Sequence, residues 1–491
     1  MVDYFHSQNV KVVCWITSTI NNDSTNFMEG KQKGYYLSDG KLIKWWRGHG
    51  ALLDYSNPAA LDWWHKQMDL VLDIGVDGWK CDGTDPYVWE LIDSYGYKGH
   101  VTEREYADYY YRDFFYYTKQ KRGDALIMAR PVDNQANLVY IDYAPHDVMF
   151  SGWVGDQTGN FDGLKVALNN IMHSAWKNYL NFGMDIGGYR TDSSSGPFGR
   201  SKEVFVRWFQ LGAFVPLMEN GGNGEHRPWK FGNDVVDTYR VFVNIHMNLV
   251  PFFLNAGAQC YAKNISVITP MSRKEPLAPT TYDYVLFDDI FVSPFTENGT
   301  IKSMKFPGKS TDSWSYWFNN SQIYQGGAQI KEFNCSYSEF PVFVKSGAIL
   351  PLQVENNYTK LGTNYSKDYF SILINNPARG IHRKKVHEYK STGFEVTYAF
   401  NDIKNTFDLY ISAHAKHKFV IIIDNLKSDM NELFLRSSIS QTSLSEIEEN
   451  LDFNEFWASP GNSAHRVNSL NRLFIKINDS ASKGLYVSIR K

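Results

Sequence analysis

The chain has 491 residues, which exceeds one ordinary domain, so we expect two to four domains. Its formal net charge of -3 gives no reason to expect binding to nucleic acid or to an anionic membrane surface. No apolar run is long enough to cross a bilayer, so we expect no membrane span. The four cysteines lack the spacing of a metal-ligand motif or of a disulfide framework, and we therefore expect no structural metal.

The first half of the chain alternates predicted strands with predicted helices. Apolar runs that end in polar or glycine residues predict strands over residues 9–20, 77–82, 125–130, 148–153 and 184–186. Helical patterns cover residues 59–74, 104–121, 161–182, 203–211 and 235–256. This alternation is typical of a parallel α/β fold, and the repeated Asp and Arg residues at strand ends favour a closed barrel over a doubly wound sheet.

From about residue 282 the pattern changes to short strands separated by Gly, Pro and Asn turns. The clearest strand pair spans residues 340–351, and the polar stretch 437–450 is predicted to be a loop or a disordered insert. We therefore expect a catalytic α/β barrel over residues 1–280, a proximal β-sandwich over residues 281–377 and a distal β-sandwich over residues 378–491.

One stretch, DGWKCDGTD at residues 77–85, carries the first candidate for chemistry. It places Asp82 at the carboxyl end of a predicted strand, which is where parallel α/β barrels keep their active sites. Most isolated Asp residues after a strand cap the following helix instead. Lys80 two residues before it and Asp85 three residues after it weaken that alternative, so Asp82 is the leading candidate for a nucleophile.

A second carboxylate, Asp156, follows another predicted strand and is expected at the same end of the barrel. Two carboxylates across a cleft are what glycosidic cleavage needs, one to attack the anomeric carbon and one to protonate the leaving oxygen. Arg130 ends an intervening strand, and Arg130 or Lys80 can bind a sugar hydroxyl and keep a nearby carboxylate ionised. The aromatic content of 16% also suits carbohydrate, although most of these rings are expected in the core.

These residues and three further motifs resemble glycoside hydrolase family 31, which contains α-glucosidases, α-xylosidases and α-galactosidases. DGWKCD resembles the family's nucleophile strand, in the variant with Lys two residues before the Asp. The motif WVGD, residues 153–156, resembles the W-x-G-D acid/base motif, and DIGGY, residues 185–189, resembles D-I-G-G-F. Residues 340–351 resemble the segment F-P-V-F-V-R-x-G-x-I-x-P that follows the barrel.

The resemblance implies a (β/α)8 barrel that hydrolyses terminal α-linked sugars with retention, through a covalent glycosyl-enzyme intermediate. Asp82 would be the nucleophile and Asp156 the acid/base, with no metal or organic cofactor. The positions implied to bind the carbohydrate are Trp15, Lys80, Arg130, Trp153, Asp185 and His226. For three of them a structural role is the alternative: Trp15 in the core, Arg130 in a salt bridge and Asp185 as a cap.

The chain also departs from the family pattern. Asp85 stands where many members have Glu, and a sugar-binding His of the family falls at Gly221 or a neighbour, with Glu219 and His226 close by. The Lys80 variant favours α-xylosidase or α-galactosidase relatives over ordinary maltose-type α-glucosidases. Because the family has an N-terminal β-sandwich and earlier barrel strands, we expect this chain to be a fragment of a longer enzyme, with a barrel that is incomplete at its N-terminus.

Two other hypotheses stay open at this stage. The chain could be a non-catalytic scaffold that binds carbohydrate or a protein partner, or a retaining α-galactosidase barrel of another family whose nucleophile strand also carries Lys-x-Asp. The localisation is unknown, but N-x-S/T sequons are a mild indication of secretory or extracellular exposure. They occur at Asn22, Asn264, Asn298, Asn319, Asn334, Asn357, Asn364 and Asn478.

Overall fold

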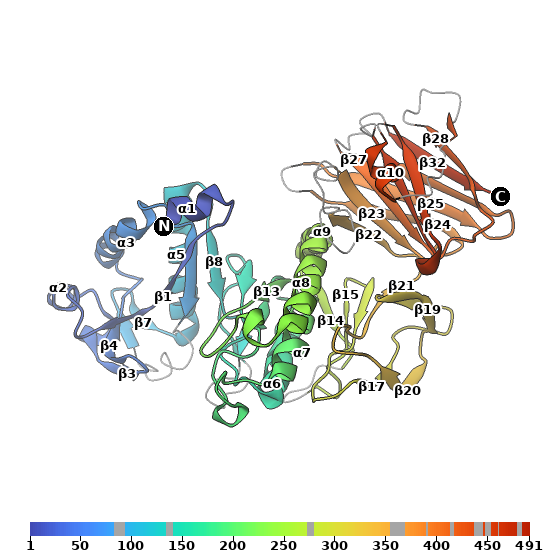
Figure 1. The fold of residues 1–491 in the computed structure, drawn as a ribbon. Coiled ribbons are helices and arrows are strands. Elements are labelled where there is room, and N and C mark those ends of the chain that lie inside the picture. Colours follow the sequence, from blue (N-terminus) through green and yellow to red (C-terminus); the bar gives the residue numbers. More distant parts are fainter. Residues whose placement is uncertain are drawn as a thin grey trace. The chain divides into compact units, whose positions relative to one another are not determined.

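The computed structural model describes residues 1–82, 94–133, 141–272, 279–353, 369–388, 391–412, 417–436, 445–446, 453–459, 461–478 and 484–491. Asp85 and most of the predicted loop at 437–450 therefore lie outside the described residues. The chain divides into two compact units (Figure 1). The first contains Met1–Gln157 and Val166–Asp185, and the second contains Thr158–Lys165, Ile186–Arg273 and Pro279–Lys491.

A parallel sheet with the strand order β1-β5-β8-β11 forms the centre of the first unit. Its strands are β1 (Val13–Thr17), β5 (Gly78–Asp82), β8 (Leu126–Ala129) and β11 (Ser151–Gly152). An isolated parallel bridge from Trp153 to Gly183 continues the series to β12 (Gly183–Asp185). Because all of these strands run in the same direction, their carboxyl ends lie along one edge of the sheet.

Three long helices alternate with these strands, namely α3 (Pro58–Leu72), α5 (Glu103–Arg122) and α6 (Phe161–Trp176). The ends of α5 follow from its sequence. Thr102 and Glu105 form a reciprocal capping box at its start, and Gly123 in a left-handed conformation ends it. The apolar face of α5 packs on β5, where Phe114 contacts Trp79 at a ring-centroid distance of 5.4 Å.

The predicted strand over residues 9–20 is two strands in different sheets. β1 ends at Thr17, and β2 (Thr19–Asn21) joins β4 (Gly48–Leu52) and β3 (Ile43–Trp45) in a small antiparallel sheet. The other short elements of the first unit are α1 (Val2–Ser7), α2 (Phe27–Gln32), η1 (Leu37–Gly40), the hairpin β6 (Ser94–Gly96) and β7 (Gly99–Val101), and the pair β9 (Val132–Asp133) and β10 (Ile141–Asp142).

The helices of the second unit are α7 (Lys202–Gly212), α8 (Asn233–Asn248) and α9 (Val250–Lys263). The prediction of a single helix over residues 235–256 was wrong. Pro251 has no backbone N–H to donate, so it is tolerated in the first turn of a helix but not in the interior, and a new helix, α9, begins there. Among the residues that the structure describes, no single helix is long and apolar enough to cross a membrane; α8 and α9 meet that test only as a pair bent by 44°.

The β-rich part of the second unit begins with a six-stranded sheet in the order β14-β15-β16-β21-β18-β19. Its strands are β14 (Ile268–Pro270), β15 (Tyr284–Leu286), β16 (Ile290–Val292), β21 (Val342–Lys345), β18 (Ser313–Tyr316) and β19 (Asn319–Gln325), and β17 (Ile301–Lys305) pairs separately with β20 (Gln329–Asn334). The predicted strand pair at 340–351 is β21 and β22 (Ile349–Gln353), but these strands belong to different sheets.

A two-sheet sandwich follows, coloured orange and red in Figure 1. One sheet has the order β22-β23-β27-β31-β30, with β23 (Tyr369–Asn375), β27 (Lys418–Asp424), β31 (Arg472–Ile477) and β30 (Ser463–Val467). The other has the order β24-β25-β26-β32-β28-β29, with β24 (Gly380–Val386), β25 (Phe394–Asn401), β26 (Thr406–Ile411), β32 (Leu485–Arg490), β28 (Glu432–Arg436) and β29 (Ser445–Glu446). Inward-facing aliphatic and aromatic side chains from both sheets form one buried core, as in β-sandwiches generally.

Candidate active site

The parallel sheet of the first unit places the candidate residues at its carboxyl edge. In the register of β1 and β5, Trp15 lies beside Lys80 and Thr17 lies beside Asp82, the last residue of β5. Arg130 follows the last residue of β8 directly. Since side chains alternate along a strand, Lys80 and Asp82 project from the same face.

The Asp82 carboxylate is held from two sides. Trp15 Nε1 donates to its Oδ2 at 3.1 Å. On the other side, Arg130 donates to its Oδ1 from Nε at 3.3 Å and from Nη2 at 3.2 Å. The Tyr110 hydroxyl donates to the Asp82 backbone carbonyl at 3.2 Å, which ties the end of β5 to α5. These bonds hold the Asp82 carboxylate in one orientation. Its side chain is 17% exposed, so solvent still reaches it.

Arg130 joins the two predicted catalytic carboxylates. Its Nη2 also donates to Asp156 Oδ1 at 3.4 Å, so a single nitrogen contacts both Asp82 and Asp156. The Arg130 side chain is only 4% exposed, whereas that of Asp156 is 20% exposed. A buried guanidinium requires anionic partners to offset its desolvation, and the carboxylate of the proposed nucleophile, Asp82, is one of them. The salt-bridge alternative for Arg130 therefore describes part of its role, but its partners are the candidate residues themselves.

Trp153 lies close to two cations of the site. Lys80 Nζ lies 4.3 Å from the centroid of its ring, and Arg130 Cζ lies 5.0 Å from the same ring. Lys80 Nζ also lies 3.9 Å from Asp185 Oδ1, and the Asp185 side chain is 2% exposed. Trp153 itself is buried, so its face supports the cations through cation–π contacts. A direct contact of Trp153 or Asp185 with a sugar stays a prediction.

Trp15 does not belong to the core, which removes one of the alternatives raised by the sequence. It is 45% exposed and meets Trp46 edge-on at a ring-centroid distance of 5.9 Å. Trp46 is 62% exposed, and the Arg47 guanidinium lies 5.1 Å from its ring. An exposed indole beside Asp82 suits the apolar face of a sugar ring.

Three residues to which the sequence analysis assigned no role support this arrangement. Asp133 forms an ion pair with Arg130 Nη1, and Asn170 of α6 donates to Asp133 Oδ1 at 2.9 Å. Gly155 has φ +97°, and a Cβ built on it would lie 2.3 Å from Asp133 Oδ2 and 2.9 Å from Arg130 Nη1. The glycine of the WVGD motif is therefore needed for both its backbone conformation and its lack of a side chain.

His226, also predicted to contact the sugar, belongs to the second unit. Its Nδ1 lies 3.1 Å from the Ile186 carbonyl and its Nε2 lies 3.2 Å from the Asn223 carbonyl. Burial and the nearby Arg200 lower the pKa of His226 to about 4, so the ring is neutral near pH 7 and only one of its nitrogens donates. Its predicted role as a sugar ligand stays a prediction.

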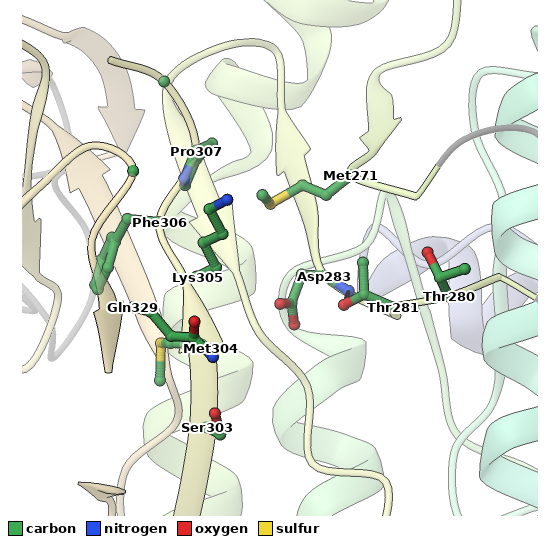
Figure 2. A pocket seen from close by; sticks show the side chains of 12 residues that line it. Met271, Thr280, Thr281, Asp283, Ser303, Met304, Lys305, Phe306, Pro307 and Gln329 are labelled. Atoms are coloured by element: carbon green, nitrogen blue, oxygen red, sulfur yellow. Dashed lines mark hydrogen bonds between the residues drawn. The ribbon is translucent and has the colours of Figure 1, made fainter. Parts of the chain in front are cut away.

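The structure also contains a separate pocket of about 730 Å³ in the β-rich part of the second unit (Figure 2). Asp283 and Thr281 line one side of it, and Lys305 and Gln329 line the other. Asp283 is buried and accepts from Ser293 Oγ at 2.7 Å, and its burial raises its pKa. None of the predicted site residues lines this pocket. Within the described ranges, no group of three or more His, Cys, Asp or Glu side chains is placed to hold a metal ion.

Glycosidases use a pair of carboxyl groups, and α/β barrels keep their active sites at the carboxyl edge of their parallel strands, as here. Comparison with known families agrees: the glycosyl hydrolases family 31 TIM-barrel domain matches residues 1–256, and the glycosyl hydrolase family 31 C-terminal domain matches residues 264–350. The chain belongs to glycosyl hydrolase family 31.

Individual relatives agree with this assignment. The chain is 26% identical to an isomaltosyltransferase from Sporosarcina globispora over 403 residues, which cover 74% of this chain and 34% of that protein. It is 22% identical to an α-xylosidase from Emericella nidulans over 361 residues, covering 70% of this chain and 44% of that protein. The chain thus spans less than half the length of these curated relatives.

Two solved structures share the fold over the whole chain. A cycloalternan-forming enzyme from Listeria monocytogenes, in complex with a pentasaccharide substrate, has a TM-score of 0.82 at 18% identity and covers 100% of this chain and 46% of its own. A dextranase from Flavobacterium johnsoniae, complexed with glucose, has a TM-score of 0.79 at 16% identity and covers 100% of this chain and 63% of its own. The predicted fold, a TIM-type barrel domain followed by β-sandwich modules, is confirmed.

Proposed function

We propose that this chain is the catalytic part of a retaining, exo-acting α-glycosidase in which Asp82 is the nucleophile and Asp156 is the acid/base. The observation that carries the proposal is the contact of Arg130 Nη2 with both carboxylates, at 3.2 Å from Asp82 Oδ1 and 3.4 Å from Asp156 Oδ1. We also propose approximate domain limits, with a barrel over residues 1–280 and β-sandwiches over 281–377 and 378–491; β14 pairs with strands of the second of these domains, and β22 and β23 pair with strands of the third.

The shared nitrogen limits the distance between the two carboxylates. The two Oδ1 atoms cannot lie farther apart than the sum of their distances to Arg130 Nη2. Retaining pairs are separated by about 5–5.5 Å, whereas inverting pairs need about 6.5–9.5 Å to admit a water molecule. The largest separation of the two Oδ1 atoms that their contacts with Arg130 Nη2 allow only just reaches the lower end of the inverting range. This separation favours retention.

The proposed reaction has two steps, and both use the same pair of residues. In the first, a carboxylate oxygen of Asp82 forms a bond to the anomeric carbon while the bond to the leaving oxygen breaks, and Asp156 gives its proton to that oxygen. In the second, Asp156 takes a proton from water, the water oxygen bonds to the anomeric carbon, and the bond to Asp82 breaks. Trp15 and Arg130 hold the nucleophile in position throughout.

Lys80, Trp15 and Asp185 are proposed to bind the sugar in this site. His226, in the second unit, is proposed separately as a sugar ligand. Lys80 supplies N–H donors and Asp185 supplies an acceptor, which suits the hydroxyls of a single terminal sugar. Curated relatives include α-xylosidases and glucosidases. We propose a substrate of the α-xyloside or α-galactoside type, on the basis of the Lys80 variant of the nucleophile strand.

Transfer of the sugar to another carbohydrate is a second candidate activity. The covalent intermediate can pass to a sugar hydroxyl in place of water, and one relative is named an isomaltosyltransferase. The exposed ring of Trp46 beside Trp15 offers an apolar surface for such an acceptor. A non-catalytic scaffold is the weaker hypothesis, because such a protein has no need to hold two carboxylates on one arginine.

The test is hydrolysis of aryl α-glucoside, α-xyloside, α-galactoside and α-N-acetylgalactosaminide by the 491-residue chain. Asp82→Ala should lose at least about 1000-fold in rate, because the nucleophile is removed. Asp77→Ala is the matched control, since Asp77 precedes the same strand and pairs with Lys11 and His6 instead. NMR of the first-formed sugar should show the α-anomer. A β-anomer, or a folded chain that cleaves none of the four, would contradict the proposal.

A further inference from the structure

Arg130 is held by a third carboxylate that the proposed chemistry does not use. Asp133 lies three residues farther along the chain, in β9, and pairs with Arg130 Nη1. Both side chains are 4% exposed. Because Asp133 occupies Nη1, the opposite edge of the guanidinium, formed by Nε and Nη2, faces Asp82 and Asp156. The planar group presents its donors in a fixed fork, so anchoring one end orients the other.

Asn170 connects this anchor to the loop that carries Asp156. Its Nδ2 donates to Asp133 Oδ1 at 2.9 Å and to the Val154 carbonyl at 2.8 Å. Gln157 Nε2 donates to the same carbonyl at 2.8 Å. Asn170 is fully buried on α6. One amide therefore fixes both the counter-ion of Arg130 and the backbone two residues before Asp156.

The same helix also holds the strand that carries Asp133. Ser174, one turn after Asn170, accepts from the Val132 amide at 3.3 Å and donates to the Asn170 carbonyl at 2.7 Å. β9 is thus attached to α6 by two buried side chains. This places Asp133 relative to α6 independently of its contact with Arg130.

We propose that Asp133 and Asn170 are positioning residues that orient Arg130 between the nucleophile and the acid/base. This inference rests on the proposed function, since it assigns those roles to Asp82 and Asp156. Neither Asp133 nor Asn170 is proposed to touch the substrate. They act through Arg130 and through the loop before Asp156.

Asp133→Asn tests the proposal with almost no change in shape. An amide has one acceptor oxygen, so the substituted side chain can accept from Arg130 or from Asn170 but not from both. Its NH2 group then faces a donor on the other side, so either the bond that anchors Arg130 or the bond that ties position 133 to Asn170 is lost, and the loss of the negative charge weakens the hold on Arg130 in both cases. Among the described residues, Asp82 on β5 and Asp156 after β11 also face this guanidinium, and Lys80 lies near the same Trp153 ring.

We expect kcat of Asp133→Asn to fall by about 100-fold, because misplacing a catalytic group by about 1 Å costs this much. We also expect the basic limb of its pH–rate profile to move to lower pH. The variant has one negative charge fewer beside Arg130, so the remaining carboxyls release their protons more readily. Asn170→Ala, which keeps the charge of Asp133, should lower kcat without this movement.

Asp77→Asn is the matched control, because it removes a carboxylate that pairs with Lys11 and His6 at the other end of β5. It should leave the pH–rate profile unchanged even if it lowers thermal stability. The proposal is overturned if folded Asp133→Asn keeps the kcat and the pH profile of the parent chain.

Crystal structures of the parent chain and of Asp133→Asn provide a readout that needs no turnover. The guanidinium of Arg130 should turn away from Asp156 in the variant. An unchanged Arg130 in the variant would refute the positioning role, whatever the activity. By contrast, loss of the proposed function would appear as full activity in Asp82→Ala, so the two failures are distinguishable.

Discussion

Gly155→Ala should damage both the stability and the activity of the chain. Gly155 has φ +97°, which costs a non-glycine residue about 1–2 kcal/mol. The added Cβ would also lie 2.3 Å from Asp133 Oδ2 and 2.9 Å from Arg130 Nη1. Both of those groups are buried and paired, so relieving the overlap should cost about 1–3 kcal/mol more. We expect a total loss of about 2–5 kcal/mol in the free energy of unfolding.

Gly123→Ala separates the two contributions. Gly123 ends α5 with φ +80°, and a Cβ at this position meets no atom within 4 Å. Urea unfolding of both variants should therefore give a larger loss for Gly155→Ala, by about 1–3 kcal/mol. Only Gly155→Ala should also lose about 100-fold in kcat, because Arg130 and Asp156 must move. Equal losses of stability, or an unchanged kcat in Gly155→Ala, would refute this reasoning.

Three further outcomes are expected. Trp15→Phe, which removes the indole donor to Asp82 Oδ2, should lower kcat/KM by about 10-fold in steady-state assays, and an unchanged value would contradict the role of that bond. Lys80→Met removes the cation beside Trp153 and Asp185, so KM should rise by at least about 10-fold, with a smaller change in kcat. His226 has a folded-state pKa of about 4, below its ordinary 6.5, so the unfolded chain binds its proton first and stability is lost as the pH falls from about 6.5 towards 4. Urea unfolding of His226→Gln should show a smaller loss over that window, and an identical loss would contradict the assignment.

The meeting of Asp82, Arg130 and Asp156 could be predicted from the sequence because parallel strands end along one edge. Each of these residues follows an apolar run that predicts a strand. Its position at the carboxyl end of that strand can therefore be predicted without knowing how the side chains pack. The helix predicted over residues 104–121 extends by only one residue at each end in α5. Strong periodicity and clear end signals explain that agreement.

The supporting role of Asn170 could not be predicted, because its partner is distant in the sequence. Asn170 contacts Asp133 across 37 residues, and nothing local distinguishes Asn170 from Asn169. Local hydrogen bonding also shortened one strand. The amides of Val148 and Met149 donate to the Pro145 carbonyl in a turn, so the strand predicted over residues 148–153 is reduced to β11.

The most direct test of the central claim is to trap the glycosyl-enzyme intermediate. The chain would be incubated with 5-fluoro-α-glycosyl fluorides of the sugar that it cleaves, digested with a protease and analysed by mass spectrometry. The account predicts that the peptide containing Asp82 gains the mass of one fluoroglycosyl group, and that Asp82→Asn gains none. Label on Asp156, or on any residue other than Asp82, would contradict it.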